Sequence, residues 1–126
     1  MINELTGSII QAAIHVHREL GPGLLESVYH RIMQYEMRKK QLDVISELAI
    51  PVRWDEIQLD LGFRADLLVN NLVVVEIKSI EAIAPVHRKQ VLTYLKLMKK
   101  PVSLLINFNV DLLRDGITRI VNGLQE

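Results

Sequence analysis

FRADLLVNNLVVVEIKS, residues 63–79, contains two apolar runs that are separated by a pair of asparagines. Asp66 stands in the first run, and Glu76 and Lys78 stand in the second. Both runs have the length and the β-branched composition of strands. A charged side chain inside a protein must be solvated or paired, and either arrangement costs free energy. We therefore expect a functional reason for these three charges.

The period of a strand decides which charges share a surface. Side chains alternate between the two faces of a strand, so Glu76 and Lys78 lie on the same face. Val75 and Ile77 point into the opposite layer. One carboxylate and one ammonium group thus share one side of the predicted sheet.

The turn of the hairpin decides whether Asp66 joins them. A loop of the two asparagines alone would pair Asp66 with Val75 and direct the carboxylate to the wrong face. Asparagine tolerates the left-handed conformation, so a type I turn followed by a bulge at Asn71 adds one residue and sets Asp66 opposite Glu76. We predict that register.

The segments around this hairpin show both helical and strand periodicity. Apolar spacing predicts helices over residues 3–20 and 24–40, divided by GPG, and a third helix between Pro85 and Pro101. The predicted strand segments are VISELAIPVRW (44–54), IQLDLG (57–62), RADLLV (64–69), LVVVEIKS (72–79) and VSLLINF (102–108), followed by GITRIVNGL (116–124) as a short strand or extended tail. This order predicts an α/β fold, more closely α+β, in which an antiparallel meander and one crossover strand form a mixed sheet covered by helices.

Composition limits the class of protein. With 126 residues and 49% apolar residues, we expect one domain, residues 1–126, with one sizeable core. Cysteine is absent and no leader pattern is evident, which fits a cytoplasmic protein. The longest apolar runs are far shorter than the roughly 20 residues that span a bilayer, so we expect no membrane insertion. Acidic and basic residues balance at 15 each, so a phosphate-bearing partner would need a local basic surface or a bound cation.

Two carboxylates and a lysine on neighbouring strands suit a hard divalent cation. Asp66 and Glu76 would bind Mg²⁺, and the cation together with Lys78 would stabilise negative charge that develops on a phosphate. Lysine could also orient or deprotonate the attacking water. The alternative is a structural salt bridge of Lys78 with one of the carboxylates. The triad alone leaves both interpretations open.

Two helices present further polar side chains. Glu26 and Tyr29 are neighbours near the N-terminus of the second helix, where a glutamate usually complements the helix dipole. His87, Gln90 and Tyr94 form one polar stripe on the third helix, for which a solvated face is the simplest interpretation.

Other polar and aromatic groups have simple structural explanations. The basic run at residues 38–40 is typical of a helix C-terminus in solvent, and the lone Trp54 is typical of packing at a strand turn. His15 and His17 point about 200° apart on a helix, which argues against joint metal binding.

Five motifs in order resemble one known family. GLLESVY (23–29), RAD (64–66), VVVEIKS (73–79), HRKQVLTYL (87–95) and LLINF (104–108) are together similar to the GxxExxY family, a branch of the PD-(D/E)XK phosphodiesterase superfamily with restriction-endonuclease-like folds. Each motif is weak alone, but their order and spacing cover nearly the whole chain.

The resemblance implies roles for individual residues. Asp66 and Glu76 match the metal ligands of the superfamily, and Lys78 matches its catalytic lysine. Glu26 matches a glutamate that is an outer or additional metal ligand. Gln90 and Tyr94 match residues beside the active site and complete the implied catalytic set.

Gly23 and Tyr29 complete the family signature and have structural or functional roles.

The implied activity is that of an Mg²⁺-dependent nuclease or related phosphodiesterase, with Mn²⁺ able to substitute. Metal-activated water would attack phosphorus in a nucleic acid, DNA or RNA. The alternative is a non-catalytic module that keeps the fold and binds nucleic acid or protein, which the neutral net charge favours. The sequence leaves open whether the chain forms a homo-oligomer.

Overall fold

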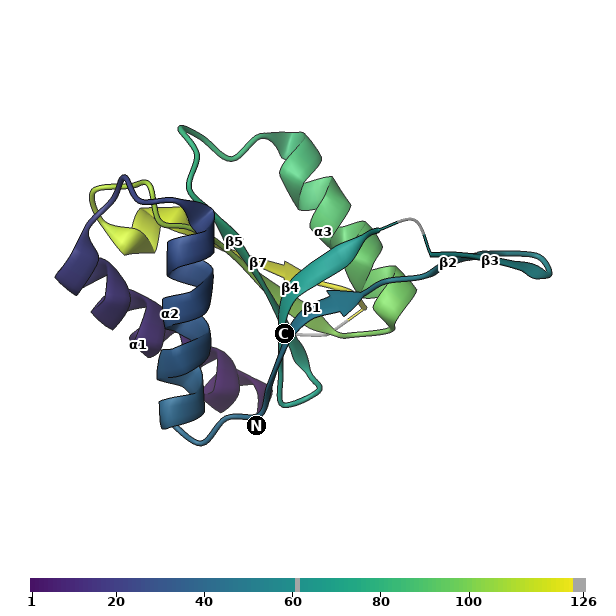
Figure 1. Cartoon of the computed structure of the whole chain (residues 1–126), viewed down its shortest axis with the longest axis horizontal. Coiled ribbons are helices and arrows are strands. Elements are labelled where there is room, and N and C mark those ends of the chain that lie inside the picture. The colour runs from purple at the N-terminus through teal and green to yellow at the C-terminus, as the bar shows by residue number, and fades with distance from the viewer. Residues whose placement is uncertain (61, 124–126) are drawn as a thin grey trace.

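The computed structural model describes residues 1–60 and 62–123, which form three α-helices, seven strands and one short 3-10 helix (Figure 1). In chain order the elements are α1 (Ile2–Leu20), α2 (Glu26–Lys39), β1 (Val44–Ala49), β2 (Val52–Trp54), β3 (Ile57–Leu59), β4 (Arg64–Val69), β5 (Val73–Lys78), α3 (Pro85–Met98), β6 (Val102–Asn107), η1 (Leu113–Gly116) and β7 (Ile117–Val121). The three predicted helices are confirmed, although the second begins at Glu26. The predicted terminal strand is confirmed as β7; Leu124 lies outside the described residues.

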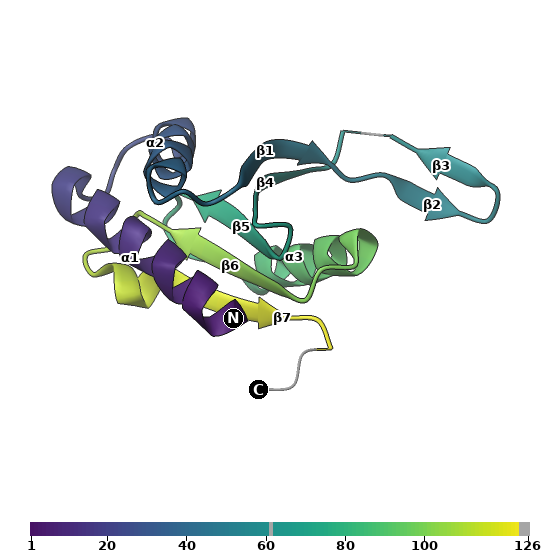
Figure 2. The same ribbon diagram turned by 90° about the horizontal axis from the view of Figure 1, so that it is seen from below.

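The main sheet has five strands in the order β1-β4-β5-β6-β7. All neighbours are antiparallel except β5 and β6, which α3 connects as a parallel crossover. α1 and α2 cover one face and α3 covers the other (Figures 1 and 2). Val75 and Ile77 are buried on the side of α1 and α2, as predicted, whereas Val74 packs near Leu95 of α3. The expected mixed sheet covered by helices is therefore confirmed.

The predicted register of the β4–β5 hairpin is confirmed. Val69 pairs with Val73, and the next two pairs follow regularly toward the open end of the hairpin. Continuing this register by one more residue sets Asp66 opposite Glu76.

The predicted turn geometry of this hairpin is wrong. Asn70 and Asn71 both have positive φ, of 51° and 57°, as in a type I′ turn. Asn70 is held there because its N–H donates to the carbonyl of Asp43 (2.8 Å) and its Oδ1 accepts the N–H of Asp43 (2.8 Å). The extra residue required by the register is Leu72, whose N–H donates to the carbonyl of Val69 (3.0 Å).

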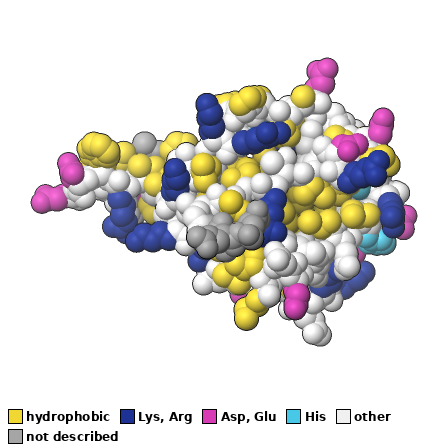
Figure 3. Space-filling view, turned by 180° about the vertical axis from the view of Figure 1, so that it is seen from behind, with side chains coloured by type: hydrophobic (Ala, Val, Ile, Leu, Met, Phe, Trp, Pro, Cys, Tyr) yellow, Lys and Arg dark blue, Asp and Glu magenta, His cyan; other side chains and the backbone are white. Residues whose placement is uncertain are grey.

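The predicted continuous meander is wrong between β1 and β4. β1 pairs directly with β4, and β2 and β3 form a separate two-stranded arm that extends from the body (Figures 1 and 2). Figure 3 shows hydrophobic side chains along this arm. Trp54 is 71% exposed, so its predicted packing role is also wrong. Pro51 lacks an N–H donor, which favours the end of a paired strand at this point.

Tyr29 fixes the connection between α1 and α2. Gly21 and Gly23 have positive φ, which gives this loop a backbone path that other residues rarely adopt. The hydroxyl of Tyr29 donates to the carbonyl of Gly21 (2.5 Å) and accepts the N–H of Leu24 (3.2 Å). Its buried ring stacks on Phe108 with 4.5 Å between ring centroids. Gly23 and Tyr29 therefore have a structural role in positioning the N-terminus of α2.

None of the helices in the described part of the chain combines the length and apolar character needed to cross a bilayer.

Candidate active site

The β4–β5 ladder opens at the two carboxylates. Its last regular pair is Leu67 with Val75. Beyond it, the N–H of Asp66 donates to Oε1 of Glu76 (3.3 Å), and the N–H of Ile77 donates to Oδ2 of Asp66 (2.7 Å). Each carboxylate thus accepts a strand N–H that would otherwise bind a backbone carbonyl. The two carboxyl groups are held against each other by the sheet itself, and we call them the carboxylate pair.

Burial controls the charge of the carboxylate pair. Glu76 is only 5% exposed. Its pKa is raised from 4.5 to about 9, first by desolvation and then by the charge of Asp66 and by hydrogen bonding between the two carboxyl groups. The N–H of Asp66 and the charge of Lys78 oppose this shift but are weaker. Without a cation the pair retains a proton at neutral pH, and a bound cation would displace it.

Lys78 is half-buried at the end of β5 and forms no ion pair with Asp66 or Glu76 in the described part of the chain. The structural salt bridge considered from the sequence is therefore not formed. The main chain here is fixed, because the carbonyl of Lys78 accepts the N–H of Phe108 (2.9 Å). The side chain of Lys78 follows Glu76 on the same face by the strand period and influences its pKa.

α3 brings Tyr94 toward the carboxylate pair. Tyr94 packs against the cluster that contains Ala65 of β4 and Val74 of β5, each next to or on the same face as a member of the pair, and its pKa is raised, first by desolvation and then by the charges of Glu76 and Asp66. Gln90 lies one helical turn earlier and is exposed. His87 instead stabilises the start of the helix, where its Nδ1 accepts the N–H of Ala84 (2.8 Å). The predicted polar stripe therefore divides into a capping residue, an exposed amide and a phenol beside the pair.

Glu26 is exposed and is the first residue of α2. The N-terminus of this helix is tied to the end of β5, because Oγ of Ser79 donates to the carbonyl of Leu24 (2.6 Å). Within residues 1–60 and 62–123, no three His, Asp or Glu side chains are grouped as a metal-binding cluster. The structure therefore brings Asp66 and Glu76 together but does not add Glu26 as a third member.

A kink in β1 beside Asp66 was not predicted. The pairs on either side place Glu47 across from Asp66, but Glu47 has a φ of 52° and leaves the extended region. Before the kink, Ser46 faces α2 and its hydroxyl is 2.8 Å from Nε2 of His30; after it, Leu48 packs on the α3 side. Asp66 thus has no regular backbone pair with either neighbouring strand. A glutamate with positive φ has no clear sequence signal.

Asn107 is a second residue that sequence reasoning missed. It is buried and lies beside Lys78 in the parallel pairing of β5 and β6. Its Oδ1 accepts the N–H groups of Ile80 (3.1 Å) and Asn109 (3.2 Å), and its Nδ2 donates to the carbonyl of Ile80 (2.9 Å). Asn107 therefore fixes the chain just after Lys78. A polar residue at the end of the apolar strand 102–107 was an available signal.

Comparison with protein families identifies the superfamily of the chain. A profile of the PD-(D/E)XK nuclease superfamily matches residues 3–120. The chain belongs to this superfamily. Comparisons with curated proteins and with solved structures gave no match.

The matched residues run from α1 into β7, so the match covers every helix and strand of the described structure at least in part. The three helices and the five-stranded mixed sheet of the described residues form a restriction-endonuclease-like fold. PD-(D/E)XK nucleases generally use divalent metal ions, and the superfamily implies nucleic acid as the class of substrate.

Proposed function

We propose that the protein is an Mg²⁺-dependent nuclease that hydrolyses phosphodiester bonds of a nucleic acid. The observation that carries this proposal is the carboxylate pair: Glu76 is buried, Asp66 is half-buried, and no basic side chain lies within ion-pair distance of either in the described part of the chain. Retaining two such carboxyl groups side by side costs free energy, so a purely structural role does not explain them well.

The donor set fits a hard divalent cation. Carboxylate oxygens are the ligands that Mg²⁺ and Mn²⁺ prefer, and displacement of the retained proton would restore two negative charges around the ion. Asp66 and Glu76 would hold the cation, with Glu26 as an outer or additional ligand. When bound, the cation supplies Lewis acidity to the phosphate and to the attacking water.

The other residues act on the substrate. Lys78 presents an ammonium group beside the pair, where it stabilises negative charge on the phosphate or orients the water. Tyr94 offers a hydroxyl near the same carboxylates for a hydrogen bond to a phosphate oxygen. Gln90 is exposed one turn away and contacts the substrate strand beside the scissile bond. Gly23, Glu26 and Tyr29 further support assignment to the GxxExxY branch. The absence of cysteine supports a reducing setting such as the cytoplasm.

A cleavage assay tests this function. Purified protein is incubated with Mg²⁺ or Mn²⁺ and with single-stranded, duplex and branched DNA and RNA, beside Glu76→Ala and the isosteric Glu76→Gln. We expect metal-dependent cleavage by the wild type and none by either variant. Wild-type protein that cleaves no substrate but binds nucleic acid would support the non-catalytic alternative. Equal activity in all three proteins would indicate a contaminating nuclease.

A further inference from the structure

A polar hollow of about 1000 Å³ lies between α2 and β1. Its lining residues are Ser27, His30, Arg31, Gln34, Tyr35, Arg38, Lys39, Ser46 and Glu47. We call this hollow the α2 groove. From it we infer that the α2 groove holds the backbone of a single-stranded segment of the nucleic acid on which the active site acts. This inference rests on the proposed function and adds the path of the substrate.

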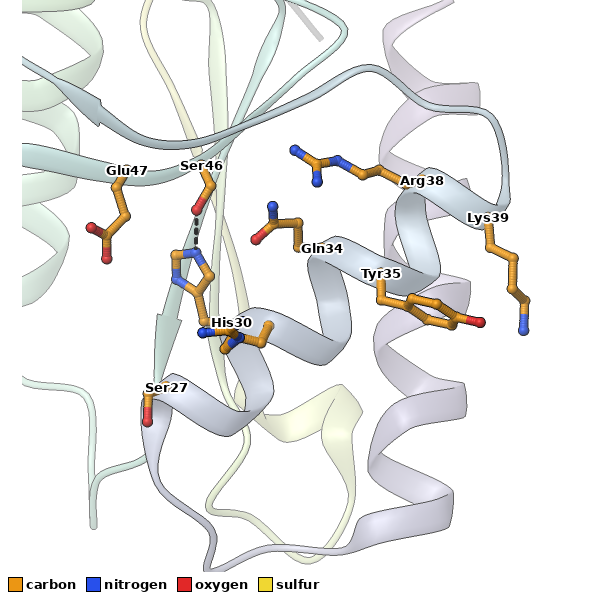
Figure 4. A pocket seen from close by; sticks show the side chains of 9 residues that line it. Ser27, His30, Gln34, Tyr35, Arg38, Lys39, Ser46 and Glu47 are labelled. Carbon is orange, nitrogen blue, oxygen red and sulfur yellow. Dashed lines mark hydrogen bonds between the residues drawn. The ribbon is translucent and has the colours of Figure 1, made fainter.

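The floor of the groove is built and held by hydrogen bonds. Figure 4 shows His30, Gln34 and Arg38 pointing from α2 toward β1, with Tyr35 and Lys39 at the outer edge. The guanidinium group of Arg38 donates to the carbonyl of Val44 (3.0 Å). With its amide oxygen turned toward Arg38, Gln34 accepts from both terminal nitrogens (2.9 and 3.1 Å). Arg38 is thus oriented by uncharged groups and keeps its full positive charge.

The groove carries more positive than negative charge, although the whole chain is neutral. Arg31 is exposed and has no ion-pair partner among the residues described, whereas Lys39 shares its charge with Glu36 (3.3 Å). Arg31 and Arg38 are therefore the two uncompensated cations. They are seven residues apart on one helix, or about 10 Å, so both can contact phosphates of the same strand.

Each wall of the groove includes one residue next to a residue of the candidate active site. On the strand wall, Glu47 lies across from Asp66 in the β1–β4 register. On the helix wall, Ser27 follows Glu26, and the chain just before them is tied to Ser79, the residue after Lys78. A strand that leaves the carboxylate pair would therefore enter the groove at its Ser27 and Glu47 end and run toward Arg38.

The shape of this region favours a single strand over a duplex. Tyr35 is 65% exposed on the same side of α2 as Arg31, so a base could stack on a ring beside a cation. One row of cations beside an exposed aromatic ring is the usual arrangement for binding an unpaired strand.

Fluorescence anisotropy in EDTA tests the groove without cleavage. The probes are a labelled 20-nucleotide mixed-sequence strand, as DNA and as RNA, and its duplex. We expect tighter binding of the single strand, weakened at least threefold by Arg31→Gln or Arg38→Gln, with the slope of log K against log salt reduced by about 0.7 for each cation removed. Tyr35→Ala should weaken single-strand binding by about fivefold or more.

Arg18→Gln is the matched control, since Arg18 is an exposed arginine that lines a different hollow beside Asp111 and Arg114. Melting temperatures check that each variant is folded. Equal affinity and salt slope for Arg31→Gln and Arg18→Gln would overturn the inference, as would preferential duplex binding or no binding by the wild type. If the wild type cleaves nucleic acid and the groove variants bind the strand as tightly as the wild type, only the role of the groove is rejected. If the groove variants bind the strand more weakly than the wild type but the wild type does not cleave it, only the catalytic function is rejected.

Discussion

The two ends of the β4–β5 hairpin satisfy their backbone groups in opposite ways. At the turn end, Val69 and Val73 form a regular pair, and Asn70 joins the hairpin to Asp43 through two hydrogen bonds of 2.8 Å. At the open end, the carboxylates of Asp66 and Glu76 take the place of backbone acceptors. The turn end uses uncharged partners and needs no other molecule. The open end places two acidic groups side by side, of which Glu76 is buried and Asp66 half-buried.

The turn end of the hairpin therefore contributes to stability, and the open end contributes to function. A side chain that accepts a strand N–H can also bind a cation, whereas a backbone carbonyl within a regular ladder is already committed. We therefore expect changes at the open end to alter metal binding and cleavage strongly, and changes at the turn end to alter only stability. The distance between the ends, about four residues or roughly 13 Å, keeps the two effects apart.

The largest expected effects are at the open end, where Lys78→Ala should reduce cleavage strongly. Removing a positive group that acts on the transition state typically costs a factor of about 10² to 10³ in rate. Mn²⁺ affinity should stay the same or increase slightly, because repulsion between the two cations is relieved. Asp66→Ala should instead lose both cleavage and the Mn²⁺ site, since a hard cation held by few protein oxygens cannot spare one.

Three measurements on these two variants separate the mechanisms: cleavage rate, Mn²⁺ titration and melting temperature. A purely structural role of Lys78 would give a lower melting temperature for Lys78→Ala without a specific loss of cleavage. Wild-type cleavage by Lys78→Ala would refute the proposed mechanism.

Local periodicity and loop length together were sufficient to predict the open end of the hairpin. Alternation along β5 correctly directed Val75 inward, and the lengthened loop correctly set Asp66 opposite Glu76, although its turn type was wrong. The turn conformation was not predictable, because Asn70 is held at positive φ by Asp43, a partner distant in sequence. The sequence also could not exclude a salt bridge of Lys78, since side-chain direction depends on packing from other elements.

Three other features could not be predicted from local patterns, because they also depend on contacts between segments distant in sequence. The kink at Glu47 depends on the pairing of β1 with β4, and the strand pattern alone could not reveal that β2 and β3 pair apart from the main sheet and are largely exposed. The nearness of Tyr94 to the carboxylate pair depends on how the crossover helix packs on the sheet. The resemblance implied a place beside the active site for Tyr94; its catalytic role remains a prediction.

The pH dependence of stability tests the electrostatics of the open end. In EDTA, folded Glu76 keeps a proton up to a pKa of about 9, whereas the unfolded chain releases it near 4.5. Between these values the unfolded state binds fewer protons, so the free energy of unfolding should fall as pH rises, by at most ~1.4 kcal/mol per pH unit. Urea titrations between pH 6 and 8.5 measure this slope.

Glu76→Gln should remove that contribution, because the amide does not titrate. Asp66, Lys78 and Tyr94 also face this position, so the informative quantity is the difference in slope between wild type and variant. Groups elsewhere in the chain contribute equally to both proteins and cancel. Identical slopes in the two proteins would show that Glu76 is not held protonated by its surroundings.

The smallest expected effect is at the turn end, where Asn70→Ala should lower the free energy of unfolding by about 1–2 kcal/mol. The substitution removes the hydrogen bond to the N–H of Asp43 and places a side chain less tolerant of positive φ at this position. Asn70→Gly loses the same hydrogen bond but accepts the backbone conformation, so it should be less destabilising than alanine. Urea denaturation gives both values, and the difference between them reports the backbone strain. Mn²⁺ affinity and cleavage should match those of the wild type in both variants, because the carboxylate pair is formed at the other end of the strands. A loss of Mn²⁺ binding in a folded Asn70→Gly protein would mean that the two ends are coupled and that the turn helps to position the site.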